Sequence, residues 1–269
     1  ILSSMKVADL GIMVLNGAHG VEVGTELIWE YKEKLALPGM FVINQCDHEK
    51  CDFDSTLDQA RSRFGARLIQ FQYPLNPGRS FNAIIDALRM VMYEYPEDGG
   101  KPLKKEIPAS EMDKAKAMHN AIVEAAAEND DTLMEHFFES GTLDESELAD
   151  GLRKGIANQT LVPVFCASAT KNMGTGRIMG FINDVCPSPA DRPPARLTNG
   201  TLKADESGAP VIFIYKTFSE PKIGRVSYFK VYSGKVRAGD ELINNTNRVH
   251  ERLNQIYVSN GKNREQVQE

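Results

Sequence analysis

Short apolar runs alternate with amphipathic stretches over the first 65 residues of the chain. Gly11–Asn16 and Met40–Ile43 are continuous apolar runs, the pattern of strands that are buried on both faces of a parallel sheet. Residues 25–35 and 55–64 instead repeat their apolar positions with a helical period, and Ser55 is the candidate N-cap of the second stretch. Strand, helix, strand and helix with short connections predict a parallel sheet that is covered by helices.

The pattern changes between residues 66 and 160. Arg67–Tyr73 has the pattern of a strand, and Phe81–Tyr95 is an apolar stretch that fits either a strand or a helix. Three helix patterns follow, the second led by Asp131 and the third by Asp144 as cap residues: Ser110–Glu128, Thr132–Glu139 and Glu145–Ala157. The block is rich in helix and acidic residues, which indicates a subdomain of its own.

The buried-strand pattern returns at Leu161–Ala167, and a helix pattern follows at residues 176–185. The sequence therefore predicts one α/β domain, formed by residues 1–65 and 161–187, that is interrupted by an inserted α+β subdomain over residues 66–160. After this domain, four prolines between residues 187 and 194 predict a stiff linker, assigned to residues 188–204.

Residues 205–269 show short strand patterns that are separated by glycine turns. Pro210–Thr217, Arg225–Tyr232 and Glu241–Asn244 carry the clearest of these patterns. Short strands with such turns are typical of a small barrel, and the four or five strands recognised here are few for a closed one. We therefore expect a partial all-β barrel domain.

Composition and charge narrow the class of protein. Hydrophobic residues make up 42% and charged residues 25% of the chain, as in proteins that bury a core. The formal net charge of -6 is unlike that of a protein that coats nucleic acid. No apolar run reaches the roughly 20 residues that span a membrane. Four cysteines in 269 residues favour a reducing compartment, so we expect a cytoplasmic protein without a membrane partner.

Two polar segments directly follow separate buried strands. Asn44-Gln45-Cys46-Asp47 follows one strand and Ser168-Ala169 follows another, and open parallel sheets bind ligands at this carboxyl edge. The carboxylate of Asp47 can accept hydrogen bonds from N1–H and the exocyclic amino group of guanine, and Asn44 can bond a ring acceptor or hold the loop. The backbone N–H of Ala169 can donate to guanine O6.

Each segment has a simpler interpretation when it is taken alone. Asn and Asp are common turn residues, so N-x-x-D after a strand is by itself most often a turn. Cys46, His48 and Cys51 form C-x-H-x-x-C, but no second pair with the spacing of a zinc finger follows, and four ligands are the rule for structural zinc. Both polar segments together, each after a buried strand, favour the guanine site.

The chain resembles elongation factor G, a translational GTPase, over essentially all of its length. The stretches that carry the resemblance stand in the same order as in that family: Ser4–Asp9, Asn16–Glu22, Arg63–Arg67, Ile84–Met90, Arg153–Gly155, Pro163–Phe165, Cys186–Pro189, Gly224–Arg225, Tyr232–Gly234 and Arg237–Asp240. The insertion between the two polar segments also matches. The resemblance implies a partial P-loop-type GTPase domain with an insertion, followed by a partial barrel.

The resemblance also implies a site, cofactors and partners. Asn44, Gln45 and Asp47 would form one guanine loop, and the second would be formed by Ser168, Ala169 and Thr170. GTP or GDP with Mg²⁺ would bind the longer protein, which would act as a monomer on the ribosome, through its RNA and proteins, in translocation or ribosome recycling. The acidic helices of the insertion are then either a solvated face or a docking surface for a basic ribosomal protein.

Two departures from the family pattern bear on activity. The family has Asn-Lys-x-Asp, whereas Gln45 stands at the lysine position here, so we expect weaker nucleotide binding or relaxed base selectivity. The phosphate loop G-x-x-x-x-G-K-[ST] does not occur in the sequence. Asp205–Gly208 spells the D-x-x-G of a switch segment, but we interpret it as a chance match. We therefore expect an internal fragment, without catalytic residues, that does not hydrolyse GTP alone.

Two alternative functions remain open on the sequence. One is a ribosome-binding paralogue with weak or no GTP hydrolysis, which Gln45 favours. The other is a different translational GTPase, such as release factor 3 or a tetracycline-protection protein. The length and content of the insertion favour elongation factor G over those two.

Overall fold

The computed structural model of the protein describes residues 1–97, 100–221, 224–261 and 263–269. In this part of the chain there are two compact units, Ile1–Asp191 and Arg192–Glu269. The first unit carries all the α-helices that the structure describes, and the second has strands alone apart from its connecting segments.

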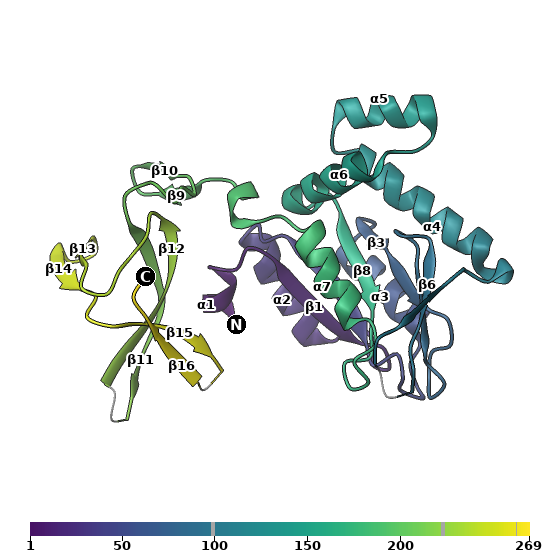
Figure 1. The fold of residues 1–269 in the computed structure, drawn as a ribbon, viewed down its shortest axis with the longest axis horizontal. Helices are drawn as coiled ribbons and strands as arrows, with labels where there is room; N and C mark the ends of the chain where they lie inside the picture. The colour runs from purple at the N-terminus through teal and green to yellow at the C-terminus, as the bar shows by residue number, and fades with distance from the viewer. Residues whose placement is uncertain (98–99, 222–223, 262) are drawn as a thin grey trace. The chain divides into compact units, whose positions relative to one another are not determined.

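A four-stranded parallel sheet lies at the centre of the first unit (Figure 1). Its strands, in spatial order, are β1 (Gly11–Asn16), β2 (Gly39–Asn44), β8 (Val162–Cys166) and β3 (Leu68–Gln70). All neighbouring pairs are parallel; Asn16 stands opposite Asn44, and Ile43 stands opposite Cys166. The α/β fold class with a parallel sheet is therefore confirmed, and the carboxyl ends of β1, β2 and β8 lie at one edge.

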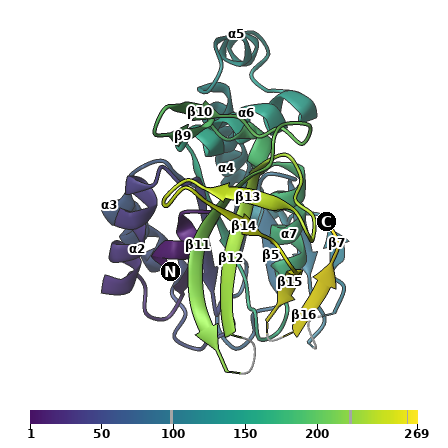
Figure 2. The ribbon, with the colours of Figure 1, turned by 90° about the vertical axis from the view of Figure 1, so that its left-hand side faces the viewer.

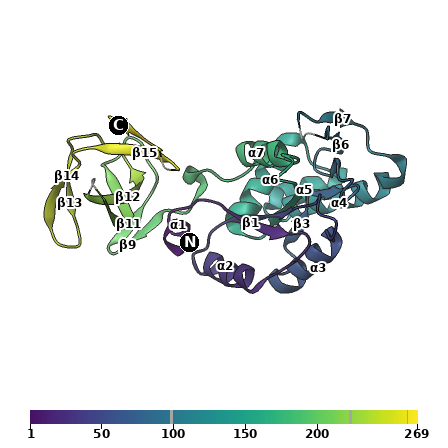
Figure 3. The same cartoon turned by 90° about the horizontal axis from the view of Figure 1, so that it is seen from below.

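Helices cover both faces of this sheet at β2 and β8 (Figure 3). At the edge strand β1 the prediction of burial on both faces is wrong, because Met13 and Leu15 join the core whereas Ile12 and Val14 on the other face are exposed. One face packs against α2 (Val23–Lys34) and α3 (Phe53–Phe64), and the other against α6 (Glu145–Asn158) and α7 (Thr175–Asp184). Side chains alternate along β2 as the period of a strand requires: Phe41 and Ile43 join the first core, whereas Met40 and Val42 join the second. Because both faces are buried, β2 has the continuous apolar sequence that predicted it.

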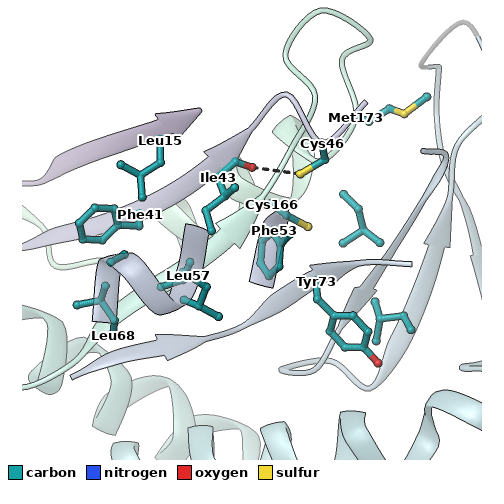
Figure 4. Packing of buried hydrophobic residues seen from close by; sticks show 14 of the residues in the cluster. Leu15, Phe41, Ile43, Cys46, Phe53, Leu57, Leu68, Tyr73, Cys166 and Met173 are labelled. Atoms are coloured by element: carbon teal, nitrogen blue, oxygen red, sulfur yellow. Dashed lines mark hydrogen bonds between the residues drawn. The ribbon is translucent and has the colours of Figure 1, made fainter. Parts of the chain in front are cut away.

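Aromatic rings form the centre of the first core. Phe41 is fully buried, and its ring lies 5.5 Å from that of Trp29 and 5.4 Å from that of Phe64. Figure 4 shows how Phe41 and Leu15 from the sheet face Leu57 of α3 in this core. The packing of β2 against α2 and α3 sets the position at which the strand ends.

The chain leaves the parallel sheet after β3 and forms a second, antiparallel sheet before its helices. The elements of this part are β4 (Gln72–Pro74), β5 (Ala83–Asp86), β6 (Val91–Glu94), β7 (Leu103–Lys105), α4 (Ala109–Ala127) and α5 (Asp131–Ser140), followed by α6. The ambiguous stretch Phe81–Tyr95 is thus a β-hairpin. The single strand predicted over Arg67–Tyr73 is two strands in two sheets, so β3 belongs to the parallel sheet although it lies within residues 66–160.

Two of the three predicted helix caps differ from the observed ones. Asp52, rather than Ser55, caps α3, because its Oδ1 accepts a hydrogen bond from the backbone N–H of Ser55 at 2.9 Å. Asp130, rather than Asp131, caps α5 through the N–H groups of Thr132 and Leu133. The prediction that Asp144 caps α6 is confirmed, with a capping box closed by Glu147.

The second unit consists of antiparallel two-stranded sheets (Figure 2). Its strands are β9 (Ala195–Leu197), β10 (Gly200–Leu202), β11 (Val211–Glu220), β12 (Gly224–Ser233), β13 (Glu241–Asn244), β14 (Val249–Arg252), β15 (Ile256–Asn260) and β16 (Asn263–Val267). The predicted β-rich fold of this region is confirmed. Within residues 188–204, assigned to a linker, the chain forms a 3-10 helix at Pro189–Asp191 and the hairpin of β9 and β10.

None of the helices in the described ranges, including the short α1 (Leu2–Met5), combines the length and the apolar character that crossing a membrane requires.

The central position of Phe41 leads to a prediction on stability. Replacement Phe41→Ala removes a fully buried ring that two aromatic side chains contact, so the free energy of unfolding should fall by about 3–5 kcal/mol. Phe138→Ala is the matched control, because the side chain of Phe138 is 79% exposed, and it should change stability by less than about 0.5 kcal/mol. Denaturant unfolding of both variants measures the difference; equal losses would contradict this core.

Candidate functional site

The loops that follow β2 and β8 meet at the carboxyl edge of the parallel sheet. Oδ1 of Asn44 accepts a hydrogen bond of 2.9 Å from the backbone N–H of Ala169, across 125 residues of sequence. The backbone continues the contact, since the Cys46 N–H donates to the Ala167 carbonyl at 3.1 Å and the Ala167 N–H donates to the Ile43 carbonyl at 3.0 Å. The structure thus brings the two predicted site segments together.

The four residues of the first loop differ in exposure. Cys46 is fully buried, Asn44 and Asp47 are half-buried, and Gln45 is exposed, with a φ of 62° that places it in the left-handed region. The carboxylate of Asp47 makes no hydrogen bond or ion pair with any residue in the described ranges. A ligand with N–H groups could therefore use both carboxylate oxygens without breaking an existing contact.

The second loop is a tight turn with its tip exposed. Ser168 is fully buried and forms a two-way bridge with Met173, through backbone hydrogen bonds of 3.0 and 2.9 Å. Its Oγ accepts a hydrogen bond from the Lys171 N–H at 3.3 Å. Ala169 and Thr170 stand exposed at the tip. Ser168 thus fixes the shape of the turn, and the next two residues form the surface that a ligand would meet.

The backbone N–H of Ala169 has a different partner from the one that the sequence suggested. We expected guanine O6 as its acceptor, but in the structure it donates to Oδ1 of Asn44. A ligand carbonyl that approaches Ala169 would share this donor with Asn44 or replace it. Asn44 therefore bridges the two loops through Oδ1, and its amide nitrogen donates to no residue in the part of the chain that the structure describes.

Glycines near the site let other segments approach the first loop. Gly17, directly after β1, donates its N–H to the Asn44 carbonyl at 2.9 Å, and a Cβ on Gly17 would lie 2.7 Å from the sulfur of Cys51. Gly78 donates its N–H to the Cys46 carbonyl at 2.7 Å and has a φ of 105°, which favours glycine.

The segment that includes Gly78 was not recognised in the sequence as part of the site. It lies in the first loop of the insertion, where Arg79 also forms an ion pair with Glu49, two residues after Asp47. The signal that could have found it is Asn76-Pro77-Gly78, a sequence typical of turns. Two contacts therefore tie the insertion to the loop that carries Asp47.

The cysteines and His48 around the first loop have structural contacts. The thiol of Cys46 donates to the Ile43 carbonyl at 3.4 Å (Figure 4), and its hydrogen bond with the Cys166 sulfur raises the pKa of Cys46 well above its usual range. Cys46 therefore remains a neutral thiol. Nδ1 of His48 accepts from the Lys50 N–H at 3.2 Å. In the described ranges, no three His, Cys, Asp or Glu side chains come together as metal ligands would.

The carboxylate of Asp205, in the D-x-x-G match, closes a local turn. It accepts hydrogen bonds from the N–H and the hydroxyl of Ser207, at 2.9 and 2.7 Å. It lies before β11 in the second unit, so these contacts agree with its interpretation as a chance match.

Comparisons with known proteins connect this geometry to a family. Residues 1–188 match the model of the elongation factor Tu GTP binding domain, and residues 210–269 match that of elongation factor G domain 2. The crystal structure of ttk003000868 from Thermus thermophilus is similar to 99% of this chain, with a TM-score of 0.82 and 25% sequence identity. The chain spans 38% of the length of that protein.

The bridge between the loops can be tested by amide exchange. Asn44→Ala removes the acceptor of the Ala169 N–H, and a net loss of about 1 kcal/mol corresponds to roughly fivefold faster exchange at Ala169. Gln45→Ala is the control, because Gln45 is exposed and should leave that amide unchanged. Hydrogen exchange followed by NMR measures both; an unchanged rate in Asn44→Ala would mean that the bridge does not hold the second loop.

Proposed function

The chain belongs to the family of elongation factor Tu GTP-binding domains, and from this premise we propose that it forms the guanine-reading part of a longer translational GTPase resembling elongation factor G. That protein would bind GTP and GDP and promote translocation or ribosome recycling. The observation that carries the proposal is the hydrogen bond between Asn44 and Ala169, since it joins two loops that can each meet one edge of a purine.

Asp47 supplies base selectivity in this proposal. Its carboxylate has no competing partner among the described residues, so it can accept from N1–H and the exocyclic amino group of guanine together. Adenine has an acceptor at N1 and no amino group at C2. A site that hydrogen-bonds a base edge rejects a base that leaves its polar groups unpaired. The loop of Ser168, Ala169 and Thr170 would meet O6 on the other side.

The remaining parts of the reaction are assigned to the longer protein. The sequence contains no phosphate-loop motif, so we assign neither the phosphates nor Mg²⁺ to residues of this chain. Mg²⁺ would stabilise the charge on the phosphates during hydrolysis. The base-reading domain would be formed by residues 1–65 and 161–187 together with β3. The rest of residues 66–160 would form the insertion. Residues 205–269 would form part of a barrel that contacts the ribosome in the cytoplasm.

Substitution of Asp47 tests directly whether its carboxylate recognises guanine. In Asp47→Asn, an amide replaces the carboxylate, and guanine loses two charge-assisted hydrogen bonds of about 1.5–3 kcal/mol each, so GDP binding should weaken at least about a hundredfold. Xanthine has a carbonyl where guanine has its amino group, so the same variant should gain affinity for xanthosine diphosphate.

Calorimetric titration of the longer protein, native and Asp47→Asn, with both nucleotides measures this exchange of preference. Asp54→Asn is a matched control, because Asp54 is exposed on α3 and should leave both affinities unchanged. Loss of GDP binding without a gain for xanthosine diphosphate would contradict base reading by Asp47.

Gln45 gives a second test of the same site. Gln45 is exposed beside Asp47, and a lysine there would lay a longer apolar stem along the plane of the base. Gln45→Lys should therefore tighten GDP binding about three- to fivefold in calorimetric titration, which corresponds to roughly 0.7–1 kcal/mol of added contact. Gln45→Met separates the stem from the charge and should recover part of the gain. Unchanged affinity in both variants would show that position 45 does not contact the base.

A further inference from the structure

A cavity of about 820 Å³ lies between the hairpin of β6 and β7 and the first turn of α7. It is separate from the face of the base loops that carries Asp47, which is not among its lining residues. The side chains that give the cavity its character are four cations and two tyrosines: Arg89, Lys101, Lys104, Arg177, Tyr93 and Tyr95. None of the described residues that line it is acidic.

Strand geometry directs one lysine of β7 to the cavity and its neighbour away from it. Lys104 stands opposite Tyr93 in the antiparallel pair, so the two side chains share the face that lines the cavity. Lys105 lies on the other face, where it forms an ion pair with Glu94. Lys101 and Lys104 are exposed and form no ion pair with a carboxylate in the described ranges. Two charges at the cavity are therefore not neutralised by these residues.

The arginines are held in place at the wall. Nη1 of Arg177 donates to the hydroxyl of Tyr93 at 2.9 Å, and its guanidinium lies 5.2 Å from the centre of that ring. The nearby carboxylate of Asp86 is buried and accepts from the side chain of Gln72 and the N–H of Arg89, at 2.9 and 3.0 Å. Arg89 itself reaches Asp184 at 3.3 Å. The phenol of Tyr93 thus positions Arg177, and the other guanidinium N–H groups form no hydrogen bond with a residue that the structure describes, so a ligand could use them.

The first turn of α7 adds backbone donors to the same wall. The helix begins at Thr175, its N-cap Gly174 provides no side-chain cap, and Thr175 and Gly176 both line the cavity. Helix N-termini carry a partial positive charge that favours anions. The N–H groups of this turn would add to the positive charge of the four basic side chains. The assignment of the site depends on the cavity and those side chains, not on the helix N-terminus alone.

We propose that this cavity binds a small molecule with several phosphate groups. A volume of about 820 Å³ lies in the range of small-molecule sites, which is roughly 300–1,000 Å³. Guanidinium groups and backbone N–H groups match phosphate oxygens in geometry as well as in charge. Because the cations come from the β5–β6 turn, from β7 and its approach, and from α7, several phosphate groups can contact more of them than a single one can.

Inorganic tripolyphosphate is the probe for this proposal. Native protein should bind one equivalent in calorimetric titration at low salt, and added salt should weaken the binding. Lys104→Gln and Lys101→Gln should each weaken it at least fivefold. Lys105→Gln removes the same charge from the adjacent residue on the opposite face, and it should change binding by less than twofold. Equal unfolding midpoints for all variants establish that the fold is intact.

Three results would overturn the proposal. Equal affinity of Lys104→Gln and Lys105→Gln for tripolyphosphate would show that the cavity face is not used. Tighter tripolyphosphate binding in Asp47→Asn would place the probe beside that carboxylate, because the variant removes a like charge, whereas we expect no change there. Binding of a decaglutamate peptide without binding of tripolyphosphate would identify the cavity as a site for acidic peptides. The lysine variants should leave GDP selectivity unchanged. Failure of the cavity proposal can therefore be distinguished from failure of the proposed function.

Discussion

The hydrogen bond from the Ala169 N–H to Asn44 Oδ1 joins two strand ends that are 125 residues apart in sequence. It can form because β2 and β8 are neighbours in a parallel sheet, with Ile43 opposite Cys166, so that both chains leave the sheet at the same edge. The packing of Phe41 against Trp29 and Phe64 fixes β2 on its helices and thereby fixes that edge. The purine site that we propose therefore depends first on the register of the sheet, which brings the two loops together, and then on the side chains that they carry.

The segment between the two loops also contacts the proposed site. The first loop of this segment contacts the loop that carries Asp47 in two ways. The Gly78 N–H donates to the Cys46 carbonyl, and Arg79 forms an ion pair with Glu49. Its β6–β7 hairpin forms one wall of the basic cavity, and α7, which follows the second base loop, forms another. The insertion therefore contacts the first loop of the proposed site directly, and Asn172, whose N–H donates to the Ala169 carbonyl at 3.2 Å, lines the cavity.

The sequence alone predicted the strands that are buried on both faces, such as β2, because a continuous apolar run like Met40–Ile43 that is bounded by turn residues is typical of a buried strand. It could not show that Arg67–Tyr73 divides between two sheets, since the period of a strand is the same in either sheet. It could not choose between Asp52 and Ser55 as the cap of α3, because both residue types cap helices and only the hydrogen bond decides. The proximity of Asn44 to the second loop was predicted, but its bond to the Ala169 N–H depends on side-chain rotation, which no sequence pattern encodes.

The most direct test of the account is to follow the backbone amides of both loops by NMR while GDP is added to the protein. If one pocket reads the base, the signals of Asp47 and Ala169 shift together and their titration curves give the same dissociation constant, while the signal of exposed Phe138 in α5 stays in place. A shift at only one loop, or two different dissociation constants, would contradict a shared site and leave the contact between Asn44 and Ala169 as a feature of the fold alone.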